Sequence, residues 1–417
     1  MRNMIRETLA VLDRHGYYPP TVTVSSRDSD GGVVVGLEQL VEFGSNDYLG
    51  LSRDSSVVEA ARSALLEWGV GSGGSRLTSG EVSPHRLVER RIAAFKGTED
   101  AVLFSTGFLA NSGVLPALLC SQARSAVAAV SPQDEAIFKD SEVFIDQLVH
   151  ASVLDGLAAA TSRMYGHGSV SFHAYRHRDA DHLDRLLTKS KASNRLVVTD
   201  GVFSLHGRIA PIADLVSVCK DRDALLYVDD AHGFGVFGQL GRGVAESQGV
   251  DLCVDFPVGT LSKAVGVAGG YLAGTEETCR YMRICARTYM YQTAMPAALA
   301  MAAIAAIDII ETQPERRQRV LEVSSGVRKS LQNFGFDTFG SESQIIPIRF
   351  HSHEKAAKAT IKLREMGILA PAYWYPAVGR DEAMVRINIT YLHTDEQVSY
   401  MLEAIGQVGR DLGVIGA

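Results

Sequence analysis

The sequence predicts an α/β fold with a mostly parallel central sheet, helices on both faces of that sheet, and an α+β C-terminal domain. Between about residue 55 and residue 290, short apolar, often β-branched segments alternate with amphipathic helical patterns, as expected for buried parallel strands joined by helices. From residue 295 onward this alternation gives way to a different order of helices and strands. We therefore expect an N-terminal arm (1–50), a large domain (51–290) and a small C-terminal domain (291–417).

The segments expected to form buried strands of the large domain are residues 101–105, 143–146, 196–200, 225–229 and 252–255. Amphipathic patterns predict helices at 57–68, 84–96 and 211–220, with Pro84 and Pro211 at positions where a helix can begin. In the C-terminal domain we expect helices from 295, over 314–333, over 355–366 and from 395, and strands over 345–350 and 384–390. Residues 121–139 have no clear period and are predicted to be a surface loop.

Composition excludes several classes of protein. The chain has 417 residues, 46% hydrophobic and 21% charged, and a net charge of -7, which gives no electrostatic footprint for nucleic acid. Its five cysteines are scattered without a CxxC pair, so neither a disulfide framework nor a zinc site is expected. The N-terminus lacks the pattern of a secretory signal, and the apolar run at 295–310 is short for a membrane span. We expect a cytoplasmic protein that binds neither membrane nor nucleic acid.

Two charged residues at predicted strand ends are candidates for catalysis. Lys263 lies among small and apolar residues with hydroxyls at Thr260 and Ser262; a desolvated lysine has a lowered pKa and becomes an amine nucleophile. Asp229 ends a strand, and a carboxylate there can keep a pyridinium nitrogen protonated, although an acidic residue at a strand end is often only a helix N-cap. His232 follows three residues later and could bond a phenolic or carbonyl oxygen.

Three further patterns suit ligand binding. The turn at Gly107 and Phe108 leads from a strand into a helix, where backbone N–H groups bind phosphate, but an ordinary tight turn would look the same. His150 could stack on a flat ring, although a single histidine is more often structural. Arg386 alternates with apolar residues on a strand and could clamp a carboxylate, or lie on the exposed face of an edge strand.

Three histidines close together in the sequence could suggest a metal site, but we do not predict one. Only His173 and His177 share same-face helical spacing, while His182 does not, and short patterns of this kind arise often by accident. No metal site is expected.

Taken together, these segments resemble the α-oxoamine synthase family of fold-type I pyridoxal-phosphate enzymes. The resemblance runs from about Phe43 to the end of the chain and rests on eight motifs in the family's order, a highly specific combination. These are Ser45-Asn46-Asp47-Tyr48-Leu49-Gly50-Leu51, Gly71-Ser72-Gly73-Gly74-Ser75-Arg76, Gly107-Phe108, His150-Ala151-Ser152, Gly201-Val202-Phe203-Ser204, Asp229-Asp230-Ala231-His232-Gly233, Thr260-Leu261-Ser262-Lys263 and Thr293-Ala294-Met295-Pro296.

The resemblance implies pyridoxal 5'-phosphate as cofactor, held as a Schiff base on Lys263, which also moves the substrate's α-proton. It implies that Asp229 partners the pyridine nitrogen, that His150 stacks on the ring, and that His232 and Ser204 contact the phenolic oxygen side. Positions around the phosphate match Gly107, Phe108, Thr260 and Ser262, with Thr293 reaching it from the neighbouring subunit of an obligate homodimer. Arg386 matches the residue that holds the amino-acid carboxylate, and Asn46 and Ser75 match positions near the substrate.

The implied reaction is a decarboxylative Claisen-type condensation of an α-amino acid with an acyl thioester, giving an α-amino ketone. Three alternatives stay open: the family member that serves biotin synthesis, a fold-type I aminotransferase, and a non-catalytic relative. Ser204-Leu205-His206-Gly207 replaces the family's commoner Ser-Met-Asp-Gly, and Tyr373-Trp374-Tyr375-Pro376 is unusually aromatic, which puts the acyl substrate in doubt. Ser75 favours alanine or a larger amino acid over glycine. The 121–139 segment is a neutral insertion or a docking site for an acyl carrier protein.

Overall fold

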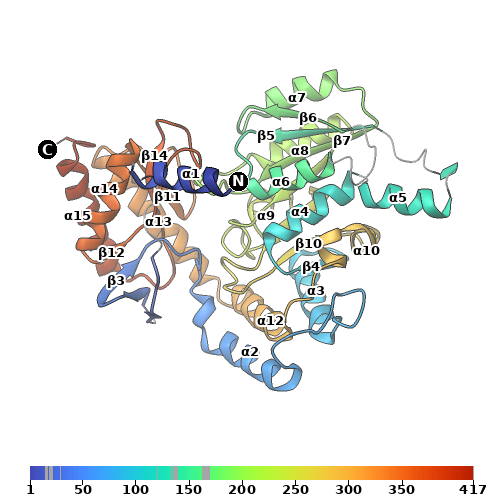
Figure 1. Cartoon of the computed structure of the whole chain (residues 1–417), viewed down its shortest axis with the longest axis horizontal. Coiled ribbons are helices and arrows are strands. Elements are labelled where there is room, and N and C mark those ends of the chain that lie inside the picture. The colour runs from blue at the N-terminus through green and yellow to red at the C-terminus, as the bar shows by residue number, and fades with distance from the viewer. Residues whose placement is uncertain are drawn as a thin grey trace.

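A seven-stranded sheet forms the centre of the computed structural model, which describes residues 1–14, 17, 22–28, 30–119, 121–131, 133–134, 140–161 and 170–416 (Figure 1). Its order is β4-β10-β9-β8-β7-β5-β6. The strands are β4 (Asp100–Phe104), β5 (Ser141–Asp146), β6 (Val170–Tyr175), β7 (Asn194–Asp200), β8 (Leu225–Asp229), β9 (Phe256–Thr260) and β10 (Gly270–Gly274). Of these seven, only β10 runs antiparallel to its neighbours, so the predicted mostly parallel sheet is confirmed.

Both faces of this sheet are buried, because successive side chains of each strand enter different hydrophobic clusters. In β8, Leu226 and Val228 join one cluster and Tyr227 joins the other. This explains why the strands are continuously apolar rather than alternating. One face is covered by α4 (Gly107–Leu118), α6 (Ala151–Ala160), α10 (Glu276–Cys285) and α11 (Arg287–Met290). The other is covered by α2 (Ser55–Trp68), α3 (Ser83–Lys96), α7 (Ala180–Lys189), α8 (Ile212–Asp221), α9 (Val244–Ser247) and α12 (Ala297–Thr312).

A second body of structure forms around the C-terminal residues, at the left of Figure 1. It contains the antiparallel sheet β11-β14-β13 and a hydrophobic cluster shared with the helices packed on it. Its elements are α13 (Glu315–Asn333), β11 (Ile345–His351), α14 (His353–Glu365), β12 (Ile368–Leu369), β13 (Ala372–Tyr373), β14 (Ala383–Asn388) and α15 (Asp395–Asp411).

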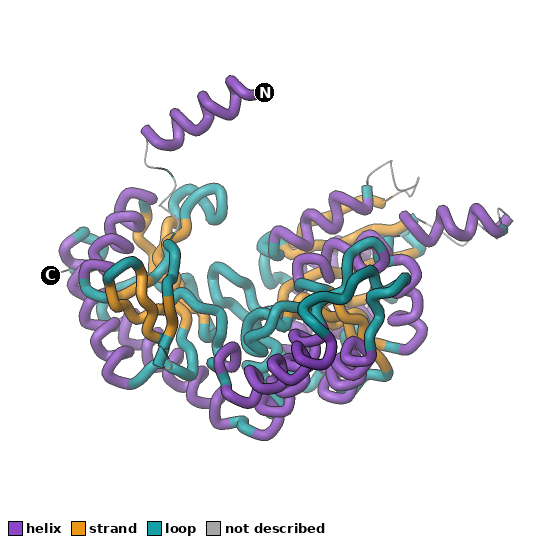
Figure 2. The backbone as a smooth tube through the Cα atoms, turned by 60° about the horizontal axis from the view of Figure 1, so that its bottom comes forward, coloured by secondary structure: helices purple, strands orange, loops and turns teal. Residues whose placement is uncertain are grey.

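The N-terminal segment joins this second body. Strands β1 (Ser26–Arg27), β2 (Gly32–Val35) and β3 (Glu38–Glu42) form a sheet in which β3 pairs in parallel with β12. The Asn388 N–H also donates to the Phe43 carbonyl oxygen at 2.7 Å. The chain therefore passes from β3 directly between the two bodies, and Figure 2 shows loops filling the region between them. The division predicted at residues 50 and 290 stays a prediction.

Two local predictions are wrong. Residues 252–255 do not form a strand: Asp251–Cys253 is a short 3-10 helix and β9 begins at Phe256. Pro257 and Gly259 lie inside β9. Because proline and glycine are rare in strand interiors, the sequence pattern did not predict a strand there. The predicted 121–139 loop begins instead with a helix, α5 (Ser121–Val130), which projects from the body in Figures 1 and 2. Residues 132 and 135–139 lie outside the described residues.

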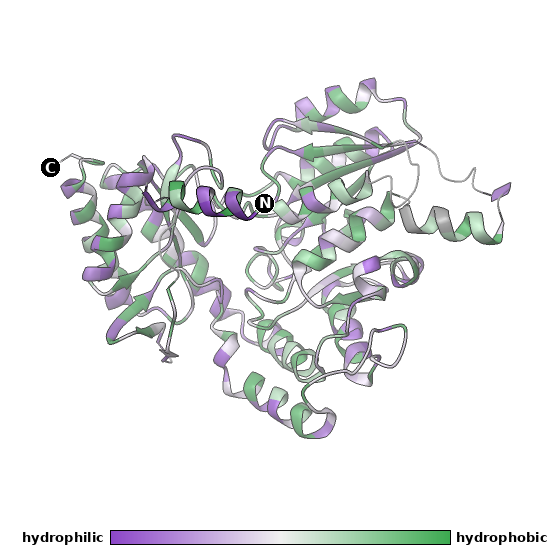
Figure 3. Cartoon of the chain, in the orientation of Figure 1, coloured by the Kyte–Doolittle hydropathy of each residue, from purple (hydrophilic) through white to green (hydrophobic). Residues whose placement is uncertain are grey.

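Helix α1 (Arg2–Arg14) has no buried residue, and its polar and apolar sides are visible in Figure 3. Among the described helices, no single one is long and apolar enough to cross a membrane. The α12–α13 pair satisfies such a test only jointly, and it bends by 72° at its break.

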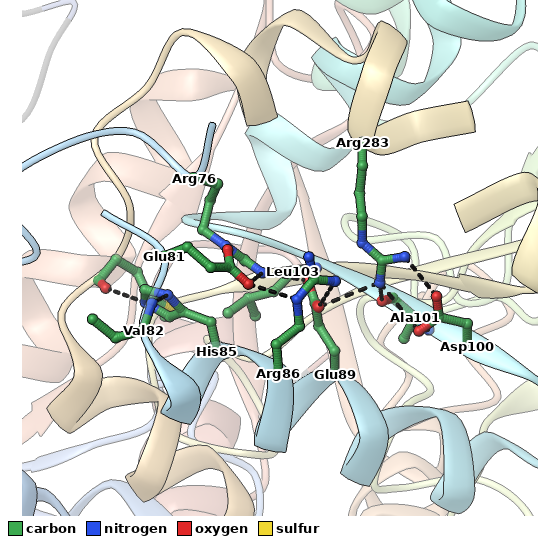
Figure 4. Close-up of polar contacts among 11 residues, drawn as sticks. Arg76, Glu81, Val82, His85, Arg86, Glu89, Asp100, Ala101, Leu103 and Arg283 are labelled. Carbon is green, nitrogen blue, oxygen red and sulfur yellow. Dashed lines mark hydrogen bonds and ion pairs between the residues drawn. The ribbon is translucent and has the colours of Figure 1, made fainter. Parts of the chain in front are cut away.

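A buried carboxylate ties α3 to the central sheet (Figure 4). The side chain of Glu89 is 1% exposed and accepts from Arg76 Nη2 at 3.0 Å and from Arg283 Nη2 at 3.3 Å. It also accepts from Arg86 Nη1 at 3.1 Å and from the Leu103 N–H of β4 at 2.9 Å. Glu89 thus compensates several buried or half-buried guanidinium charges at once.

Removal of this carboxylate is expected to destabilise the fold. Glu89→Ala removes one of the two carboxylates paired with each of Arg76 and Arg283, which keep Glu81 and Asp100, and it leaves the buried Leu103 N–H without this acceptor. We expect the free energy of unfolding to fall by about 1–3 kcal/mol. The measurement is the free energy of unfolding from urea denaturation at neutral pH. Asp308→Ala is the control, because Asp308 pairs with Arg91 but is 57% exposed, and such pairs contribute about 0–1 kcal/mol. Equal losses in the two variants would contradict the assigned role of Glu89.

Candidate functional site

The strand ends and helix starts of the large domain line a cavity of about 220 Å³ that opens to solvent. It lies at the carboxyl ends of β7, β8 and β9, where ligands collect in parallel α/β sheets. Its lining brings together most of the residues singled out from the sequence. The lining residues are Thr106, Gly107, Phe108, Asn111, His150, Ser152, Asp200, Val202, Ser204, Asp229, Ala231, His232, Thr260, Ser262 and Lys263.

Lys263 follows β9 and is half-buried at this cavity. Its Nζ lies 2.7 Å from His232 Nε2, and the other ring nitrogen of His232 lies 2.7 Å from the Tyr48 hydroxyl. Desolvation lowers the pKa of Lys263 to about 8, while the negative charges of Asp229 and Asp200 act to raise this pKa. Burial, and then the charge of Lys263, hold the pKa of His232 well below its usual value. A lysine amine beside a neutral imidazole can therefore lose its proton near neutral pH.

The carboxylate of Asp229 is held in place from both sides. Its Oδ1 accepts from the Ala231 N–H at 3.0 Å, and its Oδ2 accepts from Asn111 Nδ2 at 2.6 Å. Asp200 is its register partner on β7. Burial, and next the charge of Asp229, raise the pKa of Asp200 well above its usual value. The site thus contains a fixed carboxylate next to a second one that favours its protonated form.

His150 is the N-cap residue of α6. Its Nδ1 lies 2.7 Å from Ser152 Oγ and also accepts from the Ser152 N–H at 3.3 Å. The backbone N–H of His150 donates to Asp200 Oδ1 at 3.3 Å. Desolvation lowers the pKa of His150, with the charge of Asp229 acting in the opposite direction. The ring lines the same cavity as Lys263 and Asp229.

The start of α4 forms a cradle suited to an anion. Thr106 caps this helix by accepting from the Leu109 N–H at 3.1 Å. A Cβ on Gly107 would lie 2.8 Å from Thr260 Cβ, so only glycine permits this approach of α4 to the end of β9. The hydroxyls of Thr260 and Ser262 lie 2.8 Å apart at the same place. Helix N–H groups and hydroxyls in this arrangement are a phosphate-binding set. Phe108 lies beside them on the cavity lining and is partly exposed.

Arg386 approaches from the C-terminal body on β14 and is 5% exposed, which excludes the exposed-edge interpretation. Its Nη1 donates to the Ser204 carbonyl oxygen at 2.6 Å and its Nη2 to Asn46 Oδ1 at 3.3 Å. Its guanidinium lies 5.0 Å from the centre of the Tyr373 ring. The buried Nε has no hydrogen-bond partner among the described residues. A planar fork with a free donor fits a carboxylate.

Ser75 and Thr293 lie beside each other but not at the cavity of their own chain. They form an isolated antiparallel bridge, reinforced by the Ala294 N–H donating to the Gly74 carbonyl oxygen at 2.9 Å. Thr293 is exposed, and the described lining of the Lys263 cavity includes neither residue. The remaining predicted site residues lie at the cavity or, for Asn46 and Arg386, contact each other next to Ser204.

His173 and His177, two of the three histidines considered for a metal site, lie near carboxylates outside the Lys263 cavity. His177 Nδ1 lies 2.9 Å from Asp146, and His173 Nε2 lies 3.6 Å from Glu142. In the part of the chain that the structure describes, no three His, Cys, Asp or Glu residues are grouped to hold a metal ion.

Four residues that contact predicted site residues were not singled out individually from the sequence: Tyr48, Asn111, Ser152 and Asp200. Asp200 ends β7 as Asp229 ends β8, so its position at a strand end was a usable signal. Tyr48 and Ser152 lie inside quoted motifs. Asn111 follows Gly107 by one helical turn on α4, which places its side chain near that of Gly107 but does not reveal the partners.

Comparison with known proteins agrees with this geometry. Residues 38–405 match the family model described as aminotransferase class I and II. The chain is 36% identical over 417 residues to an 8-amino-7-oxononanoate synthase of Symbiobacterium thermophilum, covering 100% of both chains. It is 38% identical over 393 residues to 8-amino-7-oxononanoate synthase 2 of Bacillus subtilis, covering 94% of this chain and 92% of that protein.

Solved structures give the same result. A serine palmitoyltransferase of Sphingomonas wittichii matches with a TM-score of 0.88 and 29% identity over 99% of this chain and 98% of its own. A variant of the S. paucimobilis enzyme, whose structure contains bound PLP, matches equally well, with a TM-score of 0.88 and 29% identity over 99% and 98% of the two chains. An 8-amino-7-oxononanoate synthase of Francisella tularensis matches with a TM-score of 0.70 and 25% identity over 88% and 97% of the two chains.

The environment of Lys263 predicts amine reactivity at unusually low pH. In protein freed of any cofactor, labelling of Lys263 by an amine-reactive acylating reagent should rise through pH 8 as the amine loses its proton. The reference is a lysine in a model peptide, which loses its proton near pH 10. Peptide mass spectrometry over a pH series measures both. Because the charge of Asp229 raises the pKa of Lys263, Asp229→Asn should move the Lys263 midpoint below 8. A midpoint near 10 in the wild-type protein would contradict the proposed desolvation.

Proposed function

Because this chain belongs to the aminotransferase class I and II family, and within it to the α-oxoamine synthases, we propose that it condenses an α-amino acid with an acyl thioester, with loss of carbon dioxide. It is a pyridoxal-phosphate-dependent C-acyltransferase. The observation that supports the proposed reaction best is the junction of a lysine amine, a fixed carboxylate and a carboxylate clamp around one cavity. Lys263 and Asp229 line this cavity, and Arg386 bonds the backbone of Ser204 at its edge.

The residues present fit pyridoxal phosphate. Thr106, Gly107, Thr260 and Ser262 form an anion cradle, which exists because Gly107 has no Cβ to collide with Thr260. We propose that they hold the phosphate, that Asp229 faces the ring nitrogen, and that Lys263 binds the aldehyde carbon. When bound, the cofactor supplies an electron sink next to the α-carbon of the amino acid. We assign His150 to the ring face, and His232 with Ser204 to the phenolic oxygen side.

The chain's own residues account for the proton and carboxylate handling. The Lys263 amine, with a pKa of about 8, is sufficiently deprotonated near neutral pH to accept the α-proton and later to return it. Arg386, with the Asn46 carbonyl beside it, fixes the carboxylate and thereby the orientation of the α-carbon. In the overall reaction the α-carbon bonds to the thioester carbonyl carbon, the thiol leaves, and the substrate carboxylate departs as carbon dioxide.

A second candidate is narrower: synthesis of 8-amino-7-oxononanoate, the product named for the curated relatives. The departures at His206 and in the aromatic 373–376 segment weigh against it. His206 is buried, with its Nε2 3.6 Å from Glu382, and Tyr373 lies against Arg386. Tyr373 thus contacts the amino-acid clamp directly, and His206 follows by two residues the Ser204 that Arg386 bonds, so both departures can change the acyl group that is accepted.

A matrix of amino acids against acyl thioesters tests the proposal. Thiol release and carbon dioxide release should occur together for the correct pair, with alanine or a larger amino acid preferred to glycine, and mass spectrometry should identify the α-amino ketone. Formation of pyridoxamine phosphate and a keto acid without thioester consumption would instead establish an aminotransferase. Retention of the cellular role by Lys263→Ala, together with loss of the cofactor absorption band, would establish a non-catalytic relative.

Arg386 is expected to determine amino-acid affinity rather than cofactor affinity. Arg386→Lys keeps the charge but loses the planar fork, so the KM for the amino acid should rise about 10- to 100-fold. Steady-state kinetics with each substrate varied in turn measures this effect, and the cofactor absorption band gives the cofactor affinity. Arg349→Lys is a control, because Arg349 lies on β11 and pairs with Asp337 at 3.1 Å. A rise confined to the KM of the thioester would assign Arg386 to the other substrate.

We further propose a homodimer in which Thr293, with Ser75 beside it, completes the cavity of the partner subunit. Support comes from their position away from their own cavity and from apolar side chains exposed on the segment of chain that leads to Ser75. Among these, Leu66 is 83% and Val70 83% exposed, on or just after α2. Exposed apolar patches of this kind mark interfaces in soluble proteins.

Mixed dimers test the shared site. If Thr293 acts in the partner's cavity, a heterodimer of Lys263→Ala and Thr293→Ala chains contains one site with both wild-type residues. Co-purified heterodimers carrying two different tags should then regain close to half of the wild-type turnover, whereas each homodimer stays impaired. No gain over the Thr293→Ala homodimer would place Thr293 in its own chain's site.

The thioester carrier and the location are finer proposals. We keep docking of an acyl carrier protein at the 121–139 segment as a hypothesis; unchanged activity with a carrier-bound thioester after deletion of this segment would end it. A cytoplasmic location is compatible with the free thiols of Cys219, Cys253, Cys279 and Cys285.

A further inference from the structure

We propose that Ser152, held by Asn111, is a positioning residue that keeps His150 neutral at Nδ1 and makes its Nε2–H a hydrogen-bond donor to the substrate. This inference rests on the proposed function, because it concerns the same cavity. It adds two residues to which the sequence analysis assigned no role, and it gives His150 a defined tautomer.

The proton positions in this cluster follow from chemistry. Asn111 Oδ1 carries no proton, so the Tyr227 hydroxyl donates to it, at 2.5 Å. The Asn111 amide nitrogen therefore faces the other way, donating to Asp229 Oδ2 at 2.6 Å and to Ser152 Oγ at 2.8 Å. Every polar atom of this buried amide is used, and Asn111 is 1% exposed. Its orientation is thus fixed by three partners.

Ser152 links Asn111 to His150 through hydrogen bonds. Ser152 Oγ accepts from Asn111 and lies 2.7 Å from His150 Nδ1; because that nitrogen also accepts from the Ser152 N–H and so carries no proton, the Ser152 hydroxyl must donate to it. The Ser152 N–H points to the same nitrogen at 3.3 Å. Two donors converging on Nδ1 require a bare nitrogen there, which puts the ring proton on Nε2.

Close packing of two helices makes this contact possible. α4 and α6 lie side by side (Figure 1), and a Cβ on Gly156 would lie 2.7 Å from the Asn111 carbonyl oxygen. Gly156 is one helical turn after Ser152 on α6, so both lie on the helix face toward α4. The glycine brings the Asn111 side chain within reach of Ser152.

The charges around His150 agree with a neutral ring. Lys263 disfavours protonation of His150, whereas Asp229 and Asp155 favour it, and desolvation is the largest influence and lowers the pKa of the ring. His232, also near the Lys263 amine, has its own pKa lowered by burial. The neutral ring leaves Nε2–H as the polar edge that His150 can offer to an oxygen of the substrate.

The test uses the holoenzyme labelled with ring-15N histidine, with His150→Gln identifying the signal of His150. In the wild-type protein the 15N shifts should show a bare Nδ1 and a protonated Nε2. Ser152→Ala should give a mixture of tautomers and raise the KM for the amino acid about fivefold to tenfold, the effect of one lost hydrogen bond. Ser152→Thr keeps a hydroxyl and should restore both measurements toward wild type.

Ser112→Ala is the matched control. Ser112 is next to Asn111 on α4, and its Oγ has no hydrogen-bond partner among the described residues. This variant should retain the wild-type tautomer. A protonated Nδ1 in the wild-type spectrum, or an unchanged spectrum and KM in Ser152→Ala, would overturn the inference. Neither result would affect the proposed function, which fails separately if no amino acid and thioester pair releases thiol and carbon dioxide.

Discussion

The amine of Lys263 lies where three parallel strands end, and its desolvation there is the constraint to which the surrounding structure responds. A buried ammonium is unfavourable unless opposite charge is close. Asp229 and Asp200 provide that charge from the ends of β8 and β7, yet both lie in the same low-dielectric region. Burial, and next the charge of Asp229, raise the pKa of Asp200, because two adjacent carboxylates in such a region cannot both ionise freely. The result is an amine whose pKa of about 8 lies close to neutral pH, as acid–base catalysis near neutral pH requires.

The hydrogen-bond network of Asn111 gives this electrostatic arrangement its geometry. Asp229 is bound by Asn111 on one oxygen and by the Ala231 N–H on the other, so its carboxylate cannot turn away from the cavity. The same amide reaches Ser152 and, through it, His150. A change at any of these residues is therefore felt at the others, since in a buried network each unpaired group carries a desolvation cost.

Much of this site could be predicted from sequence, because the residues concerned follow recognisable strands. Asp229 and Lys263 were found since apolar, β-branched segments ending in polar residues mark the carboxyl ends of parallel strands. The strand leading to Lys263 was nevertheless misplaced, because Pro257 and Gly259 lie inside β9. The short strand β10 was missed for a related reason: it begins at Gly270, which must be glycine because a Cβ there would lie 2.5 Å from the Thr106 carbonyl oxygen. Tertiary contact outweighed local propensity at both places.

Contacts between distant segments are what the sequence could not provide. Asn46 meets Arg386 across 340 residues because β3 pairs with β12, which brings the N-terminal segment onto the C-terminal body. The neighbours of Arg386 on β14 therefore pack in a different hydrophobic cluster from the neighbours of Lys263. The two are joined at Ser204, whose carbonyl oxygen accepts from Arg386. Any relative movement of the two bodies must change the distance between the clamp and the amine. Since the α-carbon of a bound amino acid lies between its carboxylate and its amino group, this distance sets how well Lys263 can reach the α-proton. Packing between the bodies, remote from the reacting atoms, is thus part of what determines the rate.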